Sequence, residues 1–208
     1  MTPVINRNTT AREPGRLIYL MGASGVGKDS LLEYLRTHLP DDAPVRLPRR
    51  YITRPEDAGG EAHIEIDEET FRWHAALGGF AMHWDSHGFH YGIGRDIDTW
   101  LAQGLQVVLN GSRHYLENAR SRYPTLRPVL VSVSHDALHQ RLRQRGREND
   151  EEIERRLQRA EALDRELTHS DLTILHNDGP LREAGEALLE LVLEDSQPTS
   201  RVRRAGGM

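Results

Sequence analysis

The sequence predicts an α/β fold, in which a parallel sheet carries helices on both of its faces. Short apolar runs alternate with stretches of helical periodicity along most of the 208-residue chain. A glycine-rich segment, Gly22-Ala23-Ser24-Gly25-Val26-Gly27-Lys28, joins the first apolar run to the first helical stretch. Strands that alternate with helices pair in parallel, and the helices then cover both faces of the sheet. The length fits one domain with a single core.

The first half of the chain begins with the apolar run Leu17-Ile18-Tyr19-Leu20-Met21, which is typical of a buried strand. A helix is expected over residues 28–38, because leucines recur there at helical spacing. An extended segment at 45–51 comes next and ends at Arg54-Pro55. After it the alternation breaks into several short apolar runs, which predict a small strand-rich insertion at 52–95.

The regular alternation of helices and strands returns after the insertion. We expect strands at residues 106–109, 128–133 and 172–175, and helices at 96–103, 113–123, 136–145, 151–167 and 181–193. The segments at the two ends of the chain are polar, so they are expected to be loose. The domain is therefore expected at 16–195, between an N-terminal arm at 1–15 and a C-terminal tail at 196–208.

The composition argues against several functional classes. The formal net charge of −5 disfavours general nucleic-acid binding, and the absence of cysteine excludes a disulfide framework and thiolate metal sites. Residues 1–16 lack the apolar stretch of a signal peptide, and no run is long enough to span a bilayer. We expect a cytoplasmic protein whose partners are neither nucleic acid nor membrane. The sequence leaves the oligomeric state open, with a homodimer among the alternatives.

The segment from Gly22 to Lys28 has the spacing of a phosphate-binding loop. Glycine lets the backbone turn sharply, so that amide hydrogens point at phosphate oxygens at the mouth of a helix. Lys28 is placed to reach the terminal phosphates of a nucleotide. The usual loop continues with Ser or Thr, whose hydroxyl ligates Mg²⁺, but here Asp29 takes that position and Ser30 follows. Asp29 is therefore the candidate magnesium ligand, with Ser30 as its competitor, and a turn without a ligand is the weaker alternative.

Arginines are dense between Arg141 and Arg159, where acidic residues lie among them. Such a mixture is typical of a solvated helix face. Arginine also suits phosphate binding, because its planar guanidinium donates two parallel bonds and stays protonated. The position of each arginine must decide between these two interpretations.

The phosphate loop, Thr53-Arg54-Pro55, Phe89-His90-Tyr91-Gly92 and the arginine-rich stretch 141–148 together resemble the guanylate kinase group, over residues 16–193. The resemblance implies a P-loop NTPase fold, with an insertion that closes over the acceptor and an arginine lid at 141–156. It implies that Arg54 and Tyr91 hold the acceptor phosphate and that Asn177 borders the adenine of ATP. The implied lid arginines are Arg141, Arg145 and Arg156.

The positions at which this group reads guanine carry other side chains here. They are Met82, Ile93, Asn110 and Ser112. A guanine in such a pocket would leave its donors unpaired, at a cost of about 1–3 kcal/mol each. The protein is therefore not expected to read guanine, and a phosphorylated sugar fits the remaining polar residues better.

Three segments, Gly27-Lys28-Asp29-Ser30, residues 50–55 and residues 59–63, closely resemble the ribose 1,5-bisphosphate phosphokinase family, a branch of the same group associated with phosphonate breakdown. This resemblance implies transfer of the γ-phosphoryl group of ATP, with Mg²⁺, to ribose 1,5-bisphosphate. The ATP-site candidates are Gly22, Ala23, Ser24, Gly25, Val26, Gly27, Lys28, Asp29, Ser30 and Asn177. The acceptor-site candidates are Arg50, Arg54, Glu61, His63, Tyr91 and Asn110, and the catalytic candidates are Lys28, Arg54, Arg141, Arg145 and Arg156.

A phosphate acceptor is already largely ionised near neutral pH, because its second pKa is about 6, so no general base is needed. Catalysis then depends on positioning and on neutralising charge. The alternative acceptors are a nucleoside monophosphate with another base, or a sugar hydroxyl such as that of gluconate. A hydroxyl acceptor would need a carboxylate base, for which Asp85 and Asp29 are candidates. A non-catalytic binding module is a third alternative, which Lys28 and the lid arginines disfavour.

Overall fold

The computed structural model describes residues 13–56, 61–145, 150–155, 157–158 and 171–194, with residue 145 described by its backbone only. Its centre is a five-stranded sheet of order β2-β7-β1-β8-β9, and every neighbouring pair is parallel. This sheet confirms the α/β fold that the sequence predicts. Its strands are β1 (Leu17–Met21), β2 (Val45–Arg46), β7 (Gln106–Asn110), β8 (Arg127–Ser132) and β9 (Thr173–His176).

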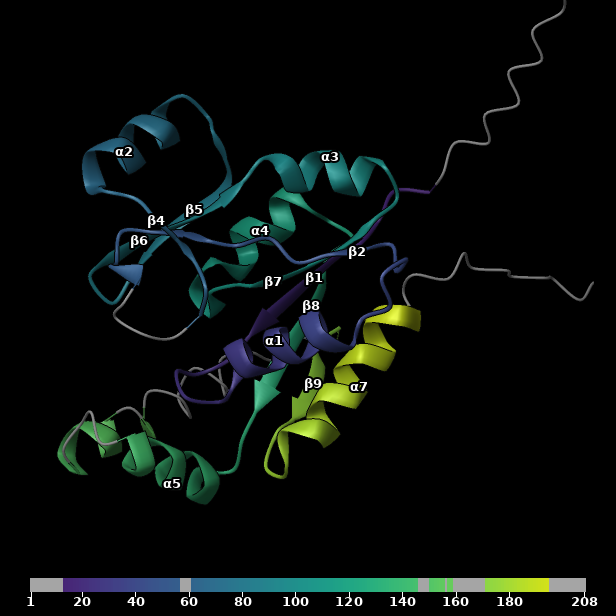
Figure 1. Cartoon of the computed structure of the whole chain (residues 1–208). Coiled ribbons are helices and arrows are strands. Elements are labelled where there is room, and N and C mark those ends of the chain that lie inside the picture. Colours follow the sequence, from purple (N-terminus) through teal and green to yellow (C-terminus); the bar gives the residue numbers. More distant parts are fainter. Residues whose placement is uncertain (1–12, 57–60, 146–149, 156, 159–170, 195–208) are drawn as a thin grey trace, which may run out of the picture.

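Helices cover both faces of this sheet (Figure 1). On β1, alternate side chains point to opposite faces, as in any strand. Ile18 and Leu20 pack in one apolar cluster with the helices α1 and α7, whereas Leu17, Tyr19 and Met21 pack in a second cluster with α3 and α4. The helix bounds are α1 (Lys28–His38), α3 (Asp96–Ala102), α4 (Leu116–Arg122), α5 (His135–Arg145) and α7 (Leu181–Glu194).

A second sheet of order β4-β3-β6-β5 occupies the segment where the sequence predicts a strand-rich insertion. Its strands β5 and β6 form an antiparallel hairpin, and β3 pairs antiparallel with β6 and parallel with β4. The elements are β3 (Tyr51–Ile52), β4 (Ile64–Glu65), α2 (Glu68–Ala76), β5 (Phe80–Ser86) and β6 (Phe89–Gly94). We call residues 51–94 the insertion from here on.

Two predicted elements differ from the structure. The extended segment expected at 45–51 is divided between β2, at the edge of the first sheet, and β3, in the second. Pro48 lies between them and has no N–H to donate to a strand ladder, which explains the break. The helix expected at 113–123 begins with the 3₁₀ turn η2 (Arg113–Tyr115) before α4. Most of the helix predicted at 151–167 lies outside the described residues.

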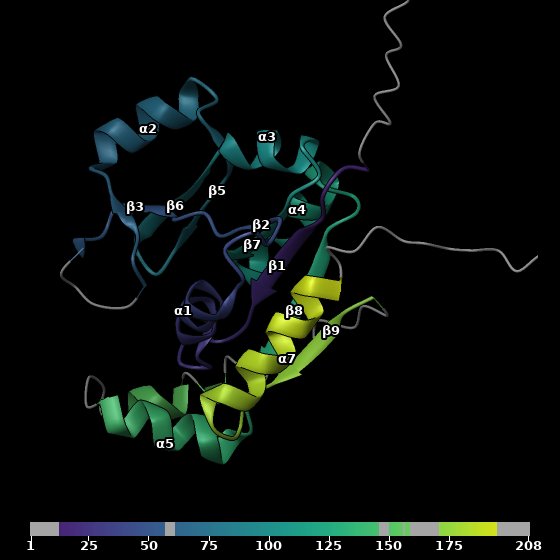
Figure 2. The same cartoon turned by 45° about the vertical axis from the view of Figure 1, so that its right-hand side comes forward.

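The carboxyl ends of the parallel strands place the candidate residues along one edge of the first sheet. β1 leads into the phosphate loop, β7 ends at Asn110, and β9 leads into Asn177. In two views 45° apart, the insertion and α5 lie on opposite sides of the N-terminus of α1 (Figures 1 and 2). Ligands of open α/β sheets bind at this edge, so the site is sought there. None of the helices in the described part of the chain has the length and apolar character needed to cross a membrane.

Candidate functional site

The phosphate loop connects β1 to α1 and depends on its glycines. Gly27 caps α1 with a left-handed backbone (φ 94°), and a Cβ there would lie 2.6 Å from the Asn177 amide nitrogen. A Cβ on Gly22 (φ 153°) would lie 2.6 Å from the carbonyl oxygen of Val131. Gly27, the N-cap residue, has no side chain that could bond the first-turn amides of α1. The first-turn amides of this helix are therefore suited to bind an anion.

Lys28 places its ammonium group inside the phosphate loop. Its Nζ donates to the carbonyl oxygens of Gly22 and Ala23, both at 2.9 Å. Burial lowers the pKa of Lys28 to about 8, an effect that nearby Asp29 opposes and that Arg50 and Arg113 reinforce. An anionic phosphate would stabilise the charged ammonium. The loop thus offers one cation and a set of amides to a polyphosphate.

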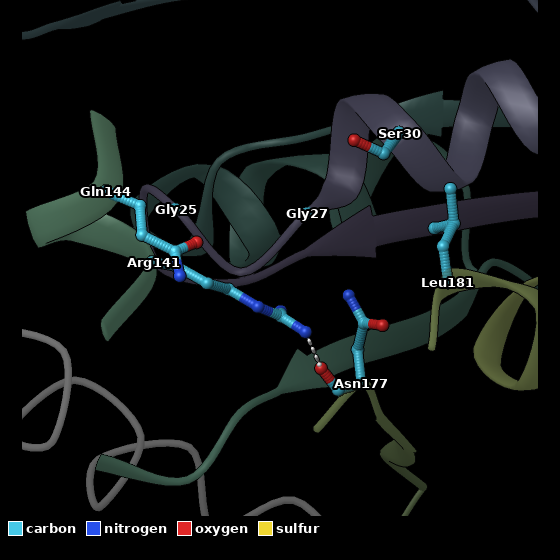
Figure 3. Close-up of a pocket in the computed structure, with 7 residues that line it drawn as sticks. All are labelled: Gly25, Gly27, Ser30, Arg141, Gln144, Asn177 and Leu181. Atoms are coloured by element: carbon cyan, nitrogen blue, oxygen red, sulfur yellow. Dashed lines mark hydrogen bonds between the residues drawn. The ribbon is translucent and has the colours of Figure 1, made fainter. Parts of the chain in front are cut away.

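A pocket of about 340 Å³ opens on the side of the loop that faces α5 and the turn after β9 (Figure 3). Asn177 is 3% exposed, and its amide nitrogen donates to the carbonyl oxygen of Val26 at 2.7 Å. Arg141 donates to the backbone oxygen of Asn177 at 2.7 Å. The volume falls in the range of small-molecule sites. The lining residues are Gly25, Gly27, Ser30, Arg141, Gln144, Asn177 and Leu181.

A second polar cluster lies at the opposite side of the helix start, facing the insertion. The side-chain nitrogen of Asn110 donates to Asp29 Oδ1 at 2.9 Å and to Glu61 Oε2 at 3.1 Å. Arg50 Nε donates to the other oxygen of Glu61, and these two side chains are only 13% and 8% exposed. Burial and the negative charge of Glu61 raise the pKa of Asp29. Burial also acts to raise the pKa of Glu61, but the charge of Arg50 and the hydrogen bonds from Arg50 and Asn110 outweigh it, so the pKa of Glu61 is lowered. The cluster links α1, β7 and the insertion.

Arg54 and Tyr91 lie beside this cluster, in the insertion. Tyr91 stacks on Trp84 with ring centroids 5.8 Å apart, and the Arg50 guanidinium lies 5.0 Å from its ring centroid. Burial raises the pKa of Tyr91, and the positive charges of Arg50 and Arg54 oppose that shift. Arg54 Nε is buried and has no hydrogen-bond partner among the described residues. A guanidinium with an unpaired buried donor is suited to an anionic ligand.

His63 holds the two ends of the segment that joins Arg54 to Glu61. It is 3% exposed, and its ring nitrogens lie 2.8 Å from the carbonyl oxygen of Arg54 and 3.0 Å from that of Glu61. The sequence predicts a direct acceptor contact for His63, whereas the structure gives both ring nitrogens to backbone oxygens. His63 is therefore placed to position Arg54 and Glu61.

Two of the four positions at which guanine would be read, Met82 and Ile93, are apolar and buried. Met82 is 1% exposed and Ile93 is 0% exposed, and both belong to the apolar cluster between the first sheet and the insertion. The Ser112 N–H donates to the Tyr19 hydroxyl at 2.9 Å. Of the four positions, only Asn110 presents a polar side chain to the cluster around Asp29.

Some predicted lid residues lie outside what the structure describes. Arg156 is not described, and of Arg145 only the backbone, at the end of α5, is described. Arg143 pairs with Asp150 at 3.0 Å on an exposed surface. Among the predicted lid arginines, Arg141 is therefore the one whose side-chain contacts the structure describes.

Two pocket residues, Gln144 and Leu181, were not predicted from the sequence. Gln144 lies within the arginine-rich stretch, and Leu181 follows the Asn177-Asp178 turn. Their closeness in sequence to Arg141 and Asn177 was the one indication that they could line the site. Tyr19 was predicted only as part of a strand. Its hydroxyl donates to the Ser112 carbonyl at 2.9 Å, and a Cβ on Gly111 would lie 2.0 Å from its ring. Tyr19 thus fixes the turn that follows Asn110.

The parallel sheet, the phosphate loop and the polar edge define a nucleotide-binding protein of the P-loop class, and the comparisons with known proteins identify its family. The chain belongs to the guanylate kinase family, whose model matches residues 14–194. A solved structure, guanylate kinase from Anaplasma phagocytophilum, matches with a TM-score of 0.68 and 16% identity, covering 90% of this chain and 89% of that one. At that identity the match supports the fold alone.

Curated relatives place the chain more finely within the family. A relative from Thiobacillus denitrificans named ribose 1,5-bisphosphate phosphokinase PhnN is 49% identical over 189 residues, or 90% of this chain and 97% of the relative. A relative with the same name from Desulfomicrobium baculatum is 50% identical over 179 residues, or 86% and 95% of the two chains. These relatives confirm the resemblance to the ribose 1,5-bisphosphate phosphokinase family that was inferred from three short segments.

Proposed function

We propose that the protein transfers the γ-phosphoryl group of ATP to ribose 1,5-bisphosphate in phosphonate breakdown, giving 5-phosphoribosyl 1-diphosphate and ADP. The observation that carries this choice is the burial of Met82 and Ile93, which leaves no polar group at those positions to read a purine. The names of relatives about half identical in sequence support the acceptor. Specificity would then come from charge and shape around Arg54 rather than from a base pocket.

The reaction forms one P–O bond and breaks another. An oxygen of the acceptor's 1-phosphate attacks the γ-phosphorus, the bond from that phosphorus to the β–γ bridging oxygen breaks, and ADP leaves with the electron pair. The attacking oxygen is already ionised near neutral pH, so no side chain has to remove a proton. The protein aligns two anions and neutralises their charge.

The described residues divide this work between two sides of the phosphate loop. The loop and Lys28 would hold the triphosphate, and the pocket of Figure 3 would take the nucleoside. Arg54 and Tyr91 would hold the acceptor phosphate. Arg141 now donates to backbone oxygens of Asn177 and Val26, so it would exchange these partners for phosphate when the lid closes. Arg145 and Arg156 complete the proposed lid.

The residues beside Lys28 fit the magnesium ion that such a kinase would use with ATP. Asp29 supplies a carboxylate oxygen. A half-turn of the buried Asn110 amide, whose nitrogen now faces Asp29, would add its Oδ1, which has no hydrogen-bond partner in the described part of the chain. Oxygen atoms are the ligands that Mg²⁺ prefers. Ser30 instead lines the nucleoside pocket, which supports Asp29 over Ser30 as the ligand. When bound, the ion would neutralise charge on the phosphate oxygens.

An acceptor screen tests the proposed function. The purified protein is incubated with ATP, Mg²⁺ and one of four acceptors, which are ribose 1,5-bisphosphate, GMP, AMP and gluconate. ADP release gives the rate, and ³¹P NMR identifies the product. We expect turnover of ribose 1,5-bisphosphate with a new diphosphate signal and little turnover of the other three. Preferential turnover of GMP, or a product phosphorylated on a sugar hydroxyl, would contradict the proposal.

The position of His63 predicts a selective effect on the acceptor. His63→Ala removes the contacts to the carbonyl oxygens of Arg54 and Glu61, so the acceptor KM should rise about tenfold, the equivalent of one hydrogen bond. The KM of ATP should change little, because the nucleoside pocket lies on the other side of the loop. His63→Gln, whose amide can still donate to one carbonyl, should recover part of the loss. An equal fall of kcat for every substrate, with both KM values unchanged, would indicate a loss of folded protein instead.

The proposal also includes a cytoplasmic location and small-molecule substrates, without nucleic acid or membrane as partners. The monomer and the homodimer differ twofold in mass. Light scattering on the protein as it elutes from a size-exclusion column would therefore distinguish the monomer from the homodimer.

A further inference from the structure

We propose that Glu61 is a second ligand of the divalent cation that accompanies the nucleotide, so that one cation joins the insertion to the phosphate loop. This inference rests on the proposed use of a cation by the kinase, but it does not depend on the identity of the acceptor. It gives Glu61 a role different from the acceptor contact that the sequence predicts.

The first support is the position of the two carboxylates. Asp29 belongs to the first turn of α1, and Glu61 precedes β4 in the insertion. Their oxygens lie 2.9 and 3.1 Å from the same nitrogen of Asn110, so the two carboxyl groups face one amide group. Two segments more than 30 residues apart in the sequence therefore bring their acids to one point, next to Lys28.

The second support is the charge balance at this point. Two partly buried carboxylates that face one amide group repel each other unless a positive charge or a proton lies between them. Arg50 bonds Oε1 of Glu61, which leaves Oε2 turned toward Asn110 and Asp29. The ammonium of Lys28 is directed to the carbonyl oxygens of Gly22 and Ala23. A cation between Asp29 and Glu61 would add to the positive charges of Lys28 and Arg50 and would shield the two carboxylates from each other.

The third support is the amide group of Asn110. Asn110 is 4% exposed, and its side-chain oxygen has no hydrogen-bond partner among the described residues. Leaving a buried polar atom unpaired is unfavourable, and a bound ion is one of the partners that can satisfy it. A half-turn of the amide would exchange the nitrogen that now faces both carboxylates for this oxygen. Three oxygen donors would then converge from α1, β7 and the insertion.

The donor set suits a divalent cation that is shared with a nucleotide. Hard cations such as Mg²⁺ and Mn²⁺ prefer carboxylate and amide oxygens, and Mg²⁺ commonly uses one or two carboxylates and takes its remaining ligands from phosphate and water. A site with two carboxylates and one amide leaves room for those ligands. Because Glu61 belongs to the insertion that carries Arg54, cation binding would also hold the acceptor-binding segment against the loop.

Mn²⁺ binding tests the inference without any turnover. The EPR signal of free Mn²⁺ is titrated with protein at a fixed concentration of ADP, for the wild type, Asp29→Asn, Glu61→Gln and the control Glu65→Gln, which lies exposed on β4. We expect Asp29→Asn and Glu61→Gln each to weaken Mn²⁺ binding by about tenfold or more, and Glu65→Gln to leave it unchanged. Thermal melting followed by circular dichroism checks that each variant is folded.

A double variant separates ligation from a general charge effect. Glu61→Gln leaves Arg50 unpaired, and that positive charge could repel Mn²⁺ by itself. If Glu61 only neutralises Arg50, the pair Arg50→Gln and Glu61→Gln should regain the wild-type affinity, which would overturn the inference. A ligand role predicts that the affinity stays low. Unchanged Mn²⁺ binding in Glu61→Gln, with a raised KM for the acceptor, would overturn it in favour of an acceptor contact. Failure of the wild type to use ribose 1,5-bisphosphate would reject the proposed acceptor and leave the Mn²⁺ result standing.

Discussion

Lys28→Met is expected to lower kcat by about 10²–10³-fold, the typical loss when one charge that stabilises a transition state is removed. The ammonium lies within the phosphate loop, where the phosphoryl group would carry negative charge in the transition state of its transfer. Methionine keeps an unbranched stem of similar length, so the loss of charge should dominate. The rate of ADP release under saturating substrates gives the effect, and a thermal melt checks that the fold is kept.

Lys28 is also the only lysine in the sequence, which allows a second measurement. An amine-selective acylating reagent should modify the wild type at this side chain and at the N-terminal amine alone. ATP should protect the side chain, and Lys28→Met should lose that site of labelling. The control is Arg36→Met, which removes a cation from the same helix but on an exposed surface. A Lys28→Met enzyme with near-normal kcat would contradict the role given to the loop.

Arg54→Gln is expected to lower kcat/KM for ribose 1,5-bisphosphate by about 10²-fold, as loss of a charge-assisted bond worth up to about 3 kcal/mol predicts. Its Nε is buried without a partner among the described residues, so the guanidinium is available to a phosphate. Glutamine keeps a polar group of smaller reach but removes the charge. Initial rates at varied acceptor and fixed saturating ATP measure the change.

Two comparisons make the Arg54 result specific. The KM of ATP should stay within about twofold, because a change well below 1 kcal/mol is expected at a site that Arg54 does not touch. Arg49→Gln removes an exposed arginine from the same segment and should leave both substrates unaffected. Equal losses of kcat/KM for ATP and ribose 1,5-bisphosphate in Arg54→Gln would mean that Arg54 does not bind the acceptor. Equal losses in Arg54→Gln and Arg49→Gln would mean the same.

Local pattern was sufficient for most of the fold. The apolar run at 17–21 and the helical spacing at 28–38 match β1 and α1, because both elements are buried along one whole strand or one helix face. Pattern failed at 45–51, where the chain passes from one sheet to the other. Periodicity describes which faces are buried and not which sheet a strand joins, so the break at Pro48 was missed.

The candidate site was predictable to the extent that single residues imply their chemistry. The loop glycines and Lys28 predict phosphate binding. The absence of polar groups at Met82 and Ile93 follows from the residue types alone. Sequence could not show that Glu61 meets Asp29 through Asn110, because the three residues belong to separate segments. It also could not show that His63 contacts two backbone oxygens instead of solvent.

The sequence by itself determined the class of protein, because a phosphate loop works through backbone conformation that local glycines impose and through a lysine at a set spacing from them. It also predicts that the protein does not read guanine, since methionine and isoleucine have no group to pair with the base. Only the tertiary structure decided how the acids, amide and arginines around Lys28 share their charges. Electrostatic energy depends on distance through space and on burial, and both arise when the insertion folds against the edge of the sheet.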